Sequence, residues 1–184
     1  DCPEFVYAFF GAIKAGVVPV PVNTMMRVSD YQYLIEDSGC AALIHSSEFS
    51  GTVDEALATA AHAPSRKLTT LELSAQMAAE SPELAAAAAT EDAVCFWLYS
   101  SGSTGSPKGV IHPHRSMVYT SQCSGVDTIG LDEDDSCFSA SKMFHSYGFG
   151  NALTFPLWVG ATMILSDQRV TPELTFEVFE KYRP

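Results

Sequence analysis

The chain has 184 residues, of which 47% are hydrophobic and 17% charged, so it can form a well-filled core and is not a wholly disordered protein. Its net charge of −12 argues against nucleic acid and anionic membranes as partners, because an acidic surface repels phosphate groups. No apolar run approaches the roughly 20 residues of a membrane-spanning helix, so no membrane partner is expected.

The five cysteines stand at positions 2, 40, 95, 123 and 137 without a CxxC pair, and they predict neither a disulfide framework nor a zinc site. We expect Cys40, Cys95 and Cys137 to be small buried hydrophobes in a reducing, cytoplasmic setting. The opening residues show no initiator methionine and no signal-peptide pattern, and the chain ends as abruptly. We therefore expect a piece of a longer protein.

The first predicted element is a helix with one apolar face. Apolar residues recur at i, i+3, i+4 and i+7 from Phe5, Asp1 stands at the N-cap position, and Gly16 supplies the stop. Residues 17–22 then predict an edge or irregular strand, because they contain two prolines that cannot donate ladder hydrogen bonds.

A second helix is expected from a Ser29 cap to Gly39, with Tyr33 facing inward. A compact strand over residues 40–45 and a helix over about 48–62 follow. Beyond them, the alanine-rich residues 71–90 predict a surface connection near a subdomain boundary, which we place at about residues 71–92.

That connection contains one predicted helix start, at Ser81-Pro82-Glu83. The elements after it alternate between apolar strands and helices. In chain order we expect a buried strand 94–99, a strand 110–112, a helix from about Arg115, a strand 137–140, a buried helix 147–159, a strand 161–165 and a helix capped by Thr171 with Leu174, Val178 and Tyr182 inward. This alternation predicts an α/β fold with a mostly parallel sheet flanked by helices.

The most informative stretch is residues 99–109, which read Tyr-Ser-Ser-Gly-Ser-Thr-Gly-Ser-Pro-Lys-Gly. Its glycines let backbone amides approach a ligand, its hydroxyls can donate to phosphate oxygens, and Lys108 adds one positive charge. Thr104 is also in a position to reach a Mg²⁺ ion bound to those phosphates. The pattern predicts a phosphate cradle, and the alternative is a flexible serine-rich surface turn.

The distribution of charge favours the cradle. Residues 93–126 contain no Asp or Glu, where this chain's average density would place about four acids. An acidic chain that keeps carboxylates away from this loop in sequence suits an anion such as a triphosphate. Three nearby cationic or titratable residues, His112, His114 and Arg115, offer further positive potential, although we favour structural or surface roles for them.

The loop differs from two common nucleotide-binding motifs. A Walker A motif needs Gly-Lys-Ser/Thr contiguous, whereas Lys108 stands between Pro107 and Gly109. The glycines at 102, 105 and 109 do not make the GxGxxG of dinucleotide-binding proteins either. The loop instead strongly resembles the signature of the adenylate-forming superfamily, which comprises acyl-CoA synthetases, peptide-synthetase adenylation domains and luciferases.

Other segments extend the resemblance over nearly the whole chain. The opening helix and residues 20–24 resemble the upstream region of the family, and residues 94–99 and 151–160 resemble its benzoate–CoA ligase branch. The resemblance is weakest over residues 48–90. It implies that the chain is an incomplete N-terminal AMP-binding domain of an aryl-acid–CoA ligase.

The resemblance also implies a reaction and its ligands. A small aromatic carboxylic acid attacks the α-phosphate of ATP, with Mg²⁺, to give acyl-AMP and pyrophosphate, and the thiol of CoA then forms the thioester. The residues implied to bind the ATP phosphates are Ser100, Ser101, Gly102, Ser103, Thr104, Gly105 and Lys108.

Residues 143–150 resemble the second family signature, where a loop and a following helix line the acyl pocket. The implied pocket residues are His145, Ser146, Tyr147 and Gly148. Tyr147 and Phe149 offer flat apolar surface for an aromatic ring, and Gly148 leaves room for it. His145 would steady the substrate carboxylate. The alternatives are a structural imidazole and two core aromatics.

One departure concerns the acid. Benzoate-type ligases tend to have Phe-Ala-Tyr-Gly where this chain has His-Ser-Tyr-Gly at residues 145–148. The added hydroxyl and imidazole favour a ring-substituted or hydroxylated benzoate as the hypothesis.

Several family parts do not occur before Pro184: the Ser/Thr-Glu segment that binds adenine and Mg²⁺, the ribose-binding Asp, and the C-terminal domain with its catalytic lysine. We expect the 184-residue chain to be inactive by itself and to self-associate through apolar faces left open. Two alternatives stay open. One is an adenylation domain for another carboxylic or amino acid, which the acid-free residues 136–166 argue against, and the other is a non-catalytic anion-binding module.

Overall fold

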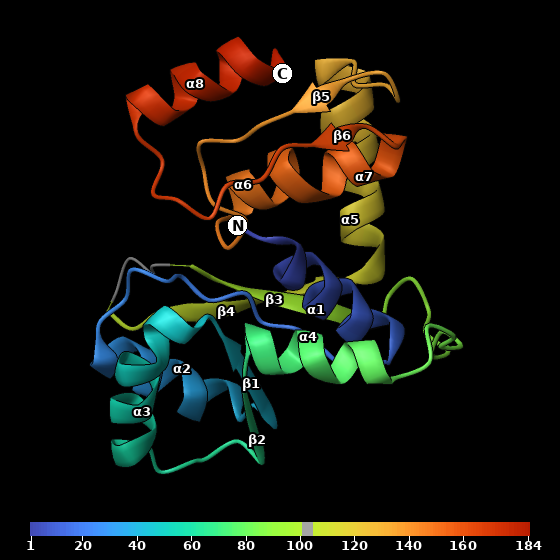
Figure 1. Cartoon of the computed structure of the whole chain (residues 1–184). Helices are drawn as coiled ribbons and strands as arrows, with labels where there is room; N and C mark the ends of the chain where they lie inside the picture. The colour runs from blue at the N-terminus through green and yellow to red at the C-terminus, as the bar shows by residue number, and fades with distance from the viewer. Residues whose placement is uncertain (101–104) are drawn as a thin grey trace. The chain divides into compact units, whose positions relative to one another are not determined.

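The computed structural model describes residues 1–100 and 105–184, and its elements are drawn in chain order in Figure 1. The chain divides into two compact units. Unit 1 comprises residues 1–22, 85–100 and 110–184, and unit 2 comprises residues 23–84 and 101–109. None of the described helices is long and apolar enough to cross a bilayer.

The core of unit 1 is aromatic. Helix α1 (Pro3–Lys14) and strand β3 (Val94–Ser100) contribute Phe9 and Phe96, whose ring centroids lie 5.6 Å apart. Phe149 closes the cluster, 5.1 Å from Phe9 and 4.9 Å from Phe96. Cys95 is buried beside them, which raises the pKa of its thiol to about 11. Cys40 and Cys137, predicted to be buried as well, are half-exposed.

Helices of unit 1 contain two π-helical stretches. Helix α5 (His114–Thr120) continues into the π-helical η2 (Ser121–Ile129) as one rod in Figure 1. Helix α6 (Ser146–Phe149), the π-helical η3 (Gly150–Thr154) and α7 (Phe155–Val159) form a second continuous helical stretch. This stretch confirms the helix predicted over residues 147–159. Pro156 lies inside this stretch, at the point where the π-helical η3 gives way to α7.

The last elements of unit 1 are two short strands and a helix. Strands β5 (Ser136–Cys137) and β6 (Thr162–Met163) pair in parallel, and α8 (Pro172–Tyr182) begins at Thr171, whose side chain accepts from the Leu174 amide at 3.2 Å. The cap is therefore confirmed. The prediction that Tyr182 faces inward is wrong, because Tyr182 is the last residue of α8 and its side chain is exposed.

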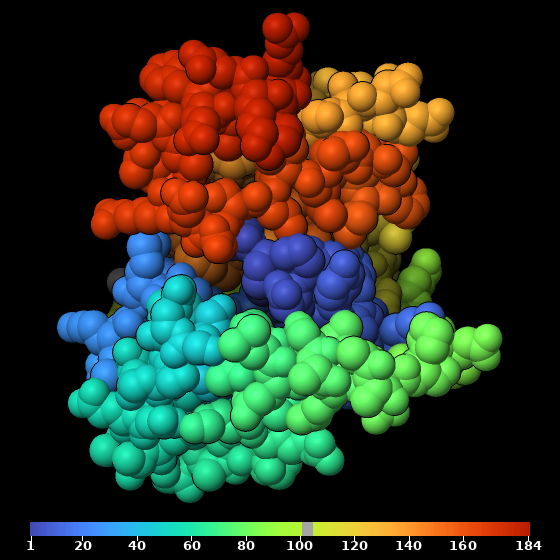
Figure 2. All heavy atoms as spheres, in the orientation of Figure 1, coloured from blue at the N-terminus to red at the C-terminus, as the bar shows by residue number. Residues whose placement is uncertain are grey.

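Helix α8 also leaves apolar side chains open. Phe176 is 71% exposed, and the atoms of α8, red in Figure 2, are uncovered on the face drawn there. Self-association of the chain stays a prediction.

Unit 2 has a smaller, aliphatic core. Helices α2 (Val28–Ser38) and α3 (Ser50–Thr59) pack together, and a Gln32 amide donates to the Thr59 carbonyl at 3.1 Å. The buried side chains on these two helices are Leu34, Ile35, Val53 and Ala56. A single 3₁₀ turn, η1 (Ser47–Phe49), precedes α3. Gly39 ends α2 in a left-handed conformation, as predicted.

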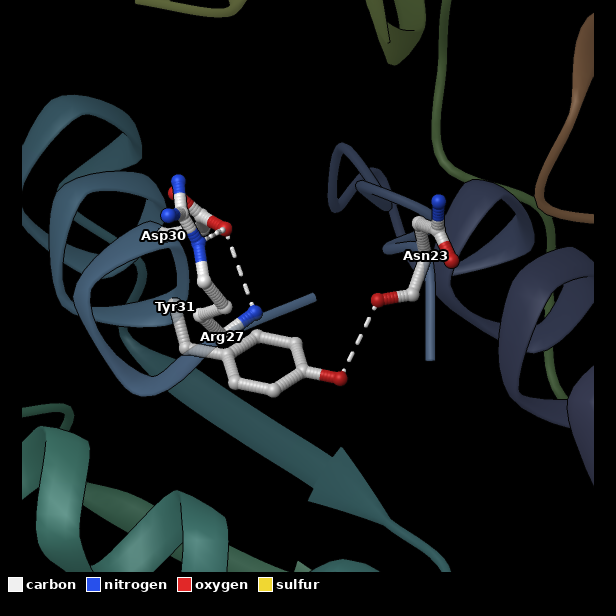
Figure 3. Close-up of polar contacts among 4 residues, drawn as sticks. All are labelled: Asn23, Arg27, Asp30 and Tyr31. Carbon is white, nitrogen blue, oxygen red and sulfur yellow. Dashed lines mark hydrogen bonds and ion pairs between the residues drawn. The ribbon is translucent and has the colours of Figure 1, made fainter. Parts of the chain in front are cut away.

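Contacts at the start of α2 correct the predicted cap (Figure 3). The Asp30 carboxylate accepts from the Arg27 amide at 3.1 Å and forms an ion pair with its guanidinium, so Arg27, not Ser29, is the N-cap. Tyr31 donates its hydroxyl to the Asn23 carbonyl at 3.1 Å. The Arg27 hydrogen bonds hold the pKa of the Asp30 carboxyl below its usual value.

The alanine-rich region differs from its prediction. Strand β2 (Arg66–Thr69) pairs in parallel with β1 (Ala42–His45), and α4 (Thr70–Ala79) follows it directly. The Thr69 hydroxyl accepts from the Glu72 amide at 3.2 Å and so caps α4, and the Glu72 carboxylate accepts from the Thr69 amide at 2.7 Å. The helix predicted at Ser81-Pro82-Glu83 does not form. The capping box starts helix α4 at Thr70, about eleven residues before the predicted start at Ser81.

The predicted mostly parallel sheet is also corrected. The described strands form three two-stranded sheets, and the sheets are partly antiparallel. β1–β2 and β5–β6 are parallel, whereas β3 pairs with the next strand, β4 (Lys108–Pro113). Residues 101–107 are too few for a parallel crossover, which needs about a dozen residues.

Candidate functional site

The predicted phosphate loop is described only in part. Ser100 ends β3 in unit 1 and is exposed. Ser101, Gly102, Ser103 and Thr104 lie outside the described residues, so their phosphate contacts and the Mg²⁺ role of Thr104 stay predictions.

The described end of the loop belongs to unit 2. Gly105 has φ +127°, a conformation that residues with a Cβ rarely adopt, so the turn requires glycine here. Pro107 follows, and its ring fixes its own φ. Lys108 then begins β4 with an exposed side chain. The segment thus combines a glycine turn, a restrained proline and a solvent-facing ammonium.

A residue that the sequence analysis did not assign to the site holds this segment. Tyr33 of α2 donates its hydroxyl to the Pro107 carbonyl at 3.0 Å. We predicted Tyr33 to face inward, and the side chain is half-buried. No local signal identifies this contact, because the two residues are 74 positions apart.

The predicted acyl segment lies in unit 1, at the start of α6. His145 is the N-cap residue of α6, and its ring lies 4.5 Å from that of Phe144. His145, Ser146 and Tyr147 are exposed, and Tyr147 is 73% exposed. These three side chains are consequently available to a ligand and are not core residues.

The next two residues are buried. Phe149 belongs to the aromatic core, so of the two predicted ring surfaces only Tyr147 remains open. At Gly148, a Cβ would lie 2.2 Å from the Ser141 carbonyl oxygen and 2.3 Å from that of Lys142. The glycine therefore permits a close contact between α6 and the preceding turn, in addition to any room it leaves for substrate.

Polar contacts fix the turn that precedes His145. The Asp1 carboxylate accepts from the Met143 amide at 3.0 Å, so Asp1 does not cap α1, whose N-cap is Cys2. The Lys142 ammonium donates to the carbonyls of Ser166 and Gln168 at 2.7 and 2.8 Å. Met143 is fully buried between these contacts.

The residues after the loop have structural partners, as favoured above. The imidazole of His112 stacks on Phe96 with centroids 4.6 Å apart, and burial lowers its pKa. Arg115 forms an ion pair with Asp92. Both interactions lie within unit 1 and give these side chains roles without a phosphate.

Proteins hold metal ions with sets of His, Cys, Asp and Glu ligands. Over residues 1–100 and 105–184, no group of three or more His, Cys, Asp or Glu residues is placed to hold a metal ion. Hydroxyl and phosphate oxygens suit Mg²⁺, which usually keeps few protein ligands. The proposed Mg²⁺ role of Thr104 falls on a residue outside the described part of the chain and stays a prediction.

Comparison with known proteins defines the class. The sequence pattern of the AMP-binding enzyme family matches residues 1–184, and the chain belongs to this family. It is homologous to ATP-dependent CoA ligases.

Three relatives show the similarity in detail. The chain is 40% identical over its whole length to a 4-hydroxybenzoate–CoA/benzoate–CoA ligase of Rhodopseudomonas palustris, of which it covers 35%. A benzoate CoA ligase structure from Burkholderia xenovorans LB400 is 38% identical with a TM-score of 0.87, over 96% of this chain and 35% of that one. An anthranilate CoA ligase in complex with anthranoyl-AMP is 29% identical with a TM-score of 0.91, over 100% and 37%. The chain spans about a third of the length of the curated relatives it matches.

Proposed function

We propose that the chain is part of the N-terminal domain of an aryl-acid–CoA ligase. The carboxylate of the acid attacks the α-phosphate of ATP, the bond to pyrophosphate breaks, and an acyl-AMP forms. The CoA thiol then attacks the acyl carbon and gives up its proton, and AMP leaves. Membership of the AMP-binding family and the relative solved with anthranoyl-AMP support the first step.

The observation that carries the proposal is the geometry of residues 105–108. The left-handed Gly105, the restrained Pro107 and the exposed Lys108 end a loop whose other proposed phosphate ligands are Ser100, Ser101, Gly102, Ser103 and Thr104. In this loop, hydroxyls, amides and an ammonium would face the charge that builds on the phosphate oxygens, and fixed donors of this kind are the main catalytic means in phosphoryl transfer. Mg²⁺ would neutralise part of that charge, with Thr104 as its proposed ligand.

The proposed acyl pocket uses the exposed end of the acyl segment. Tyr147 offers a flat surface for an aromatic ring, and His145 can direct an N–H toward the acid's carboxylate. Ser146 adds a hydroxyl beside them. These polar neighbours favour a hydroxylated or otherwise ring-substituted benzoate, and one similar ligase is named for both 4-hydroxybenzoate and benzoate.

The test of the reaction is ATP–pyrophosphate exchange on the full-length protein with Mg²⁺ and benzoate or hydroxybenzoates. We expect acid-dependent exchange that falls about 100-fold or more in Lys108→Ala, because one preorganised charge is lost at the developing anion. Lys67→Ala, which alters an exposed lysine of β2, is the matched control and should exchange like the unaltered protein. Exchange that needs no acid, or that survives Lys108→Ala, would contradict the proposal.

The substrate hypothesis has its own test. We expect the full-length protein to prefer a hydroxybenzoate over benzoate in kcat/KM, and Ser146→Ala to lower kcat/KM for that acid about tenfold, the effect of one lost hydrogen bond. If benzoate is preferred to every hydroxybenzoate and Ser146→Ala changes nothing, the hypothesis fails.

The 184-residue chain alone is proposed to be inactive, because family segments that bind adenine and ribose do not occur in it. If the purified chain releases more pyrophosphate from ATP than its Lys108→Ala variant does, this proposal is refuted.

A further inference from the structure

The contact between Tyr33 and Pro107 is local in space and remote in sequence. A phenol has one proton to donate, and it has two acceptors within reach. The Pro107 carbonyl lies at 3.0 Å and the Asp37 carboxylate at 3.4 Å. The shorter bond goes to the loop, so the proton of Tyr33 mainly serves Pro107.

The Pro107 carbonyl that accepts this bond lies next to Lys108 in the chain. The Pro107 carbonyl belongs to the peptide plane that leads into Lys108, so a hydrogen bond to this oxygen fixes how that plane is turned. The proline ring fixes the dihedral before it. On the other side of Pro107, Gly105 takes φ +127° and supplies no side chain to resist movement. The Tyr33 bond therefore adds a restraint on the Pro107–Lys108 peptide, at the point where β4 begins.

The helix that carries the Tyr33 donor is packed into the core of unit 2. Leu34 and Ile35, directly after Tyr33, are buried, and Gly39 is the C-cap of the helix. Partial burial and then the Asp37 carboxylate raise the pKa of Tyr33, so the phenol keeps its proton at neutral pH. A rigid helix thus presents a permanent donor to the loop.

We propose that Tyr33 is a positioning residue for ATP, which acts by holding the Pro107–Lys108 peptide in the orientation that binds the phosphates. This inference rests on the proposed function. Without the bond, the Pro107–Lys108 peptide samples other orientations, and the apparent affinity for ATP falls in proportion to the competent fraction.

The chain offers a matched control on the same helix. Tyr31 also donates its hydroxyl to a backbone carbonyl, that of Asn23 at 3.1 Å, which is not part of residues 105–109 (Figure 3). Tyr31→Phe and Tyr33→Phe therefore remove the same kind of bond from α2. A difference between them in ATP binding cannot come from weakening of the helix alone.

The experiment measures acid-dependent ATP–pyrophosphate exchange on the full-length protein and on both variants. We expect Tyr33→Phe to raise the KM for ATP about threefold to tenfold, as one hydrogen bond allows. The KM for the acid should be unchanged, and the Tm of Tyr33→Phe should equal that of Tyr31→Phe. Tyr33→Phe should add little to Lys108→Ala, because both act on one contact to phosphate.

The outcomes separate the two proposals. If the unaltered protein shows no exchange, the proposed function fails and Tyr33 is not in question. If exchange occurs but both tyrosine variants have the same KM for ATP, or if Tyr33→Phe and Lys108→Ala are additive, the role of Tyr33 is overturned.

Discussion

The acyl segment, residues 143–150, and the described loop end, residues 105–109, both carry proposed site residues but are held in place by different contacts. The acyl segment rests on an aromatic core through Phe149, and Asp1 and Lys142 hold its backbone. The loop end has a glycine turn, a proline and one phenol. Substitutions in the acyl segment should therefore act first on stability, whereas those in the loop end should act first on ATP binding.

The largest expected effect separates two aromatics of the acyl segment, Tyr147 and Phe149, on either side of Gly148. Phe149→Ala should lower the free energy of unfolding by roughly 3–5 kcal/mol, because it leaves a cavity among Phe9 and Phe96. Tyr147→Ala should change it by less than about 0.5 kcal/mol, since the ring is exposed, while raising the KM for an aromatic acid. Urea unfolding measures the first effect. Equal losses in both variants would place Tyr147 in the core and break the comparison.

A smaller effect concerns the close contact at Gly148. Gly148→Ala should cost about 1–3 kcal/mol, because the Cβ would meet two backbone oxygens that cannot move independently. Gly11→Ala is the control: it lies in α1 with open space around it and should stabilise the helix by up to about 1 kcal/mol. If thermal unfolding shows the two variants to be alike, α6 is not packed on residues 141–142 as described.

The smallest effect is a pH dependence in the core under the acyl segment. Burial lowers the pKa of His112 in the folded chain, so the unfolded chain takes up this proton first. The contribution of His112 to stability should be constant above its ordinary pKa of about 6.5 and should fall as the pH drops below it. His112→Phe keeps a ring against Phe96 and should flatten the decline in unfolding free energy between pH 7 and pH 5. An unchanged slope would show that His112 does not titrate differently on folding.

The sequence predicted the elements whose signals are local. The Thr171 cap, the Gly39 stop and the apolar face of α1 each act within one or two helical turns, and the structure confirms them. Helix α4 was missed although Thr69 and Glu72 form a capping box that the sequence contains. The Ser29 cap was wrong because the helix already begins at Val28, where the Asp30 carboxylate accepts from the Arg27 amide.

What the sequence did not predict depends on distant partners. The pairing of β3 with β4 follows from the length of the connection, and the roles of Asp1 and Tyr33 follow from residues 142 and 74 positions away. Of the predicted acyl residues, local pattern placed His145, Ser146 and Tyr147 on one segment, but only packing against Phe9 and Phe96 shows that Phe149 is core. The phosphate roles of residues 101–104 remain predictions.

The burial of Cys95 has a practical consequence. Its thiol is hidden and, with a pKa of about 11, carries almost no thiolate at neutral pH, whereas Cys123 is exposed. An alkylating reagent should modify Cys123 in the native protein and reach Cys95 only when unit 1 opens. The rate of Cys95 alkylation therefore measures how often the aromatic core opens. Mass spectrometry can follow the alkylation of each cysteine separately.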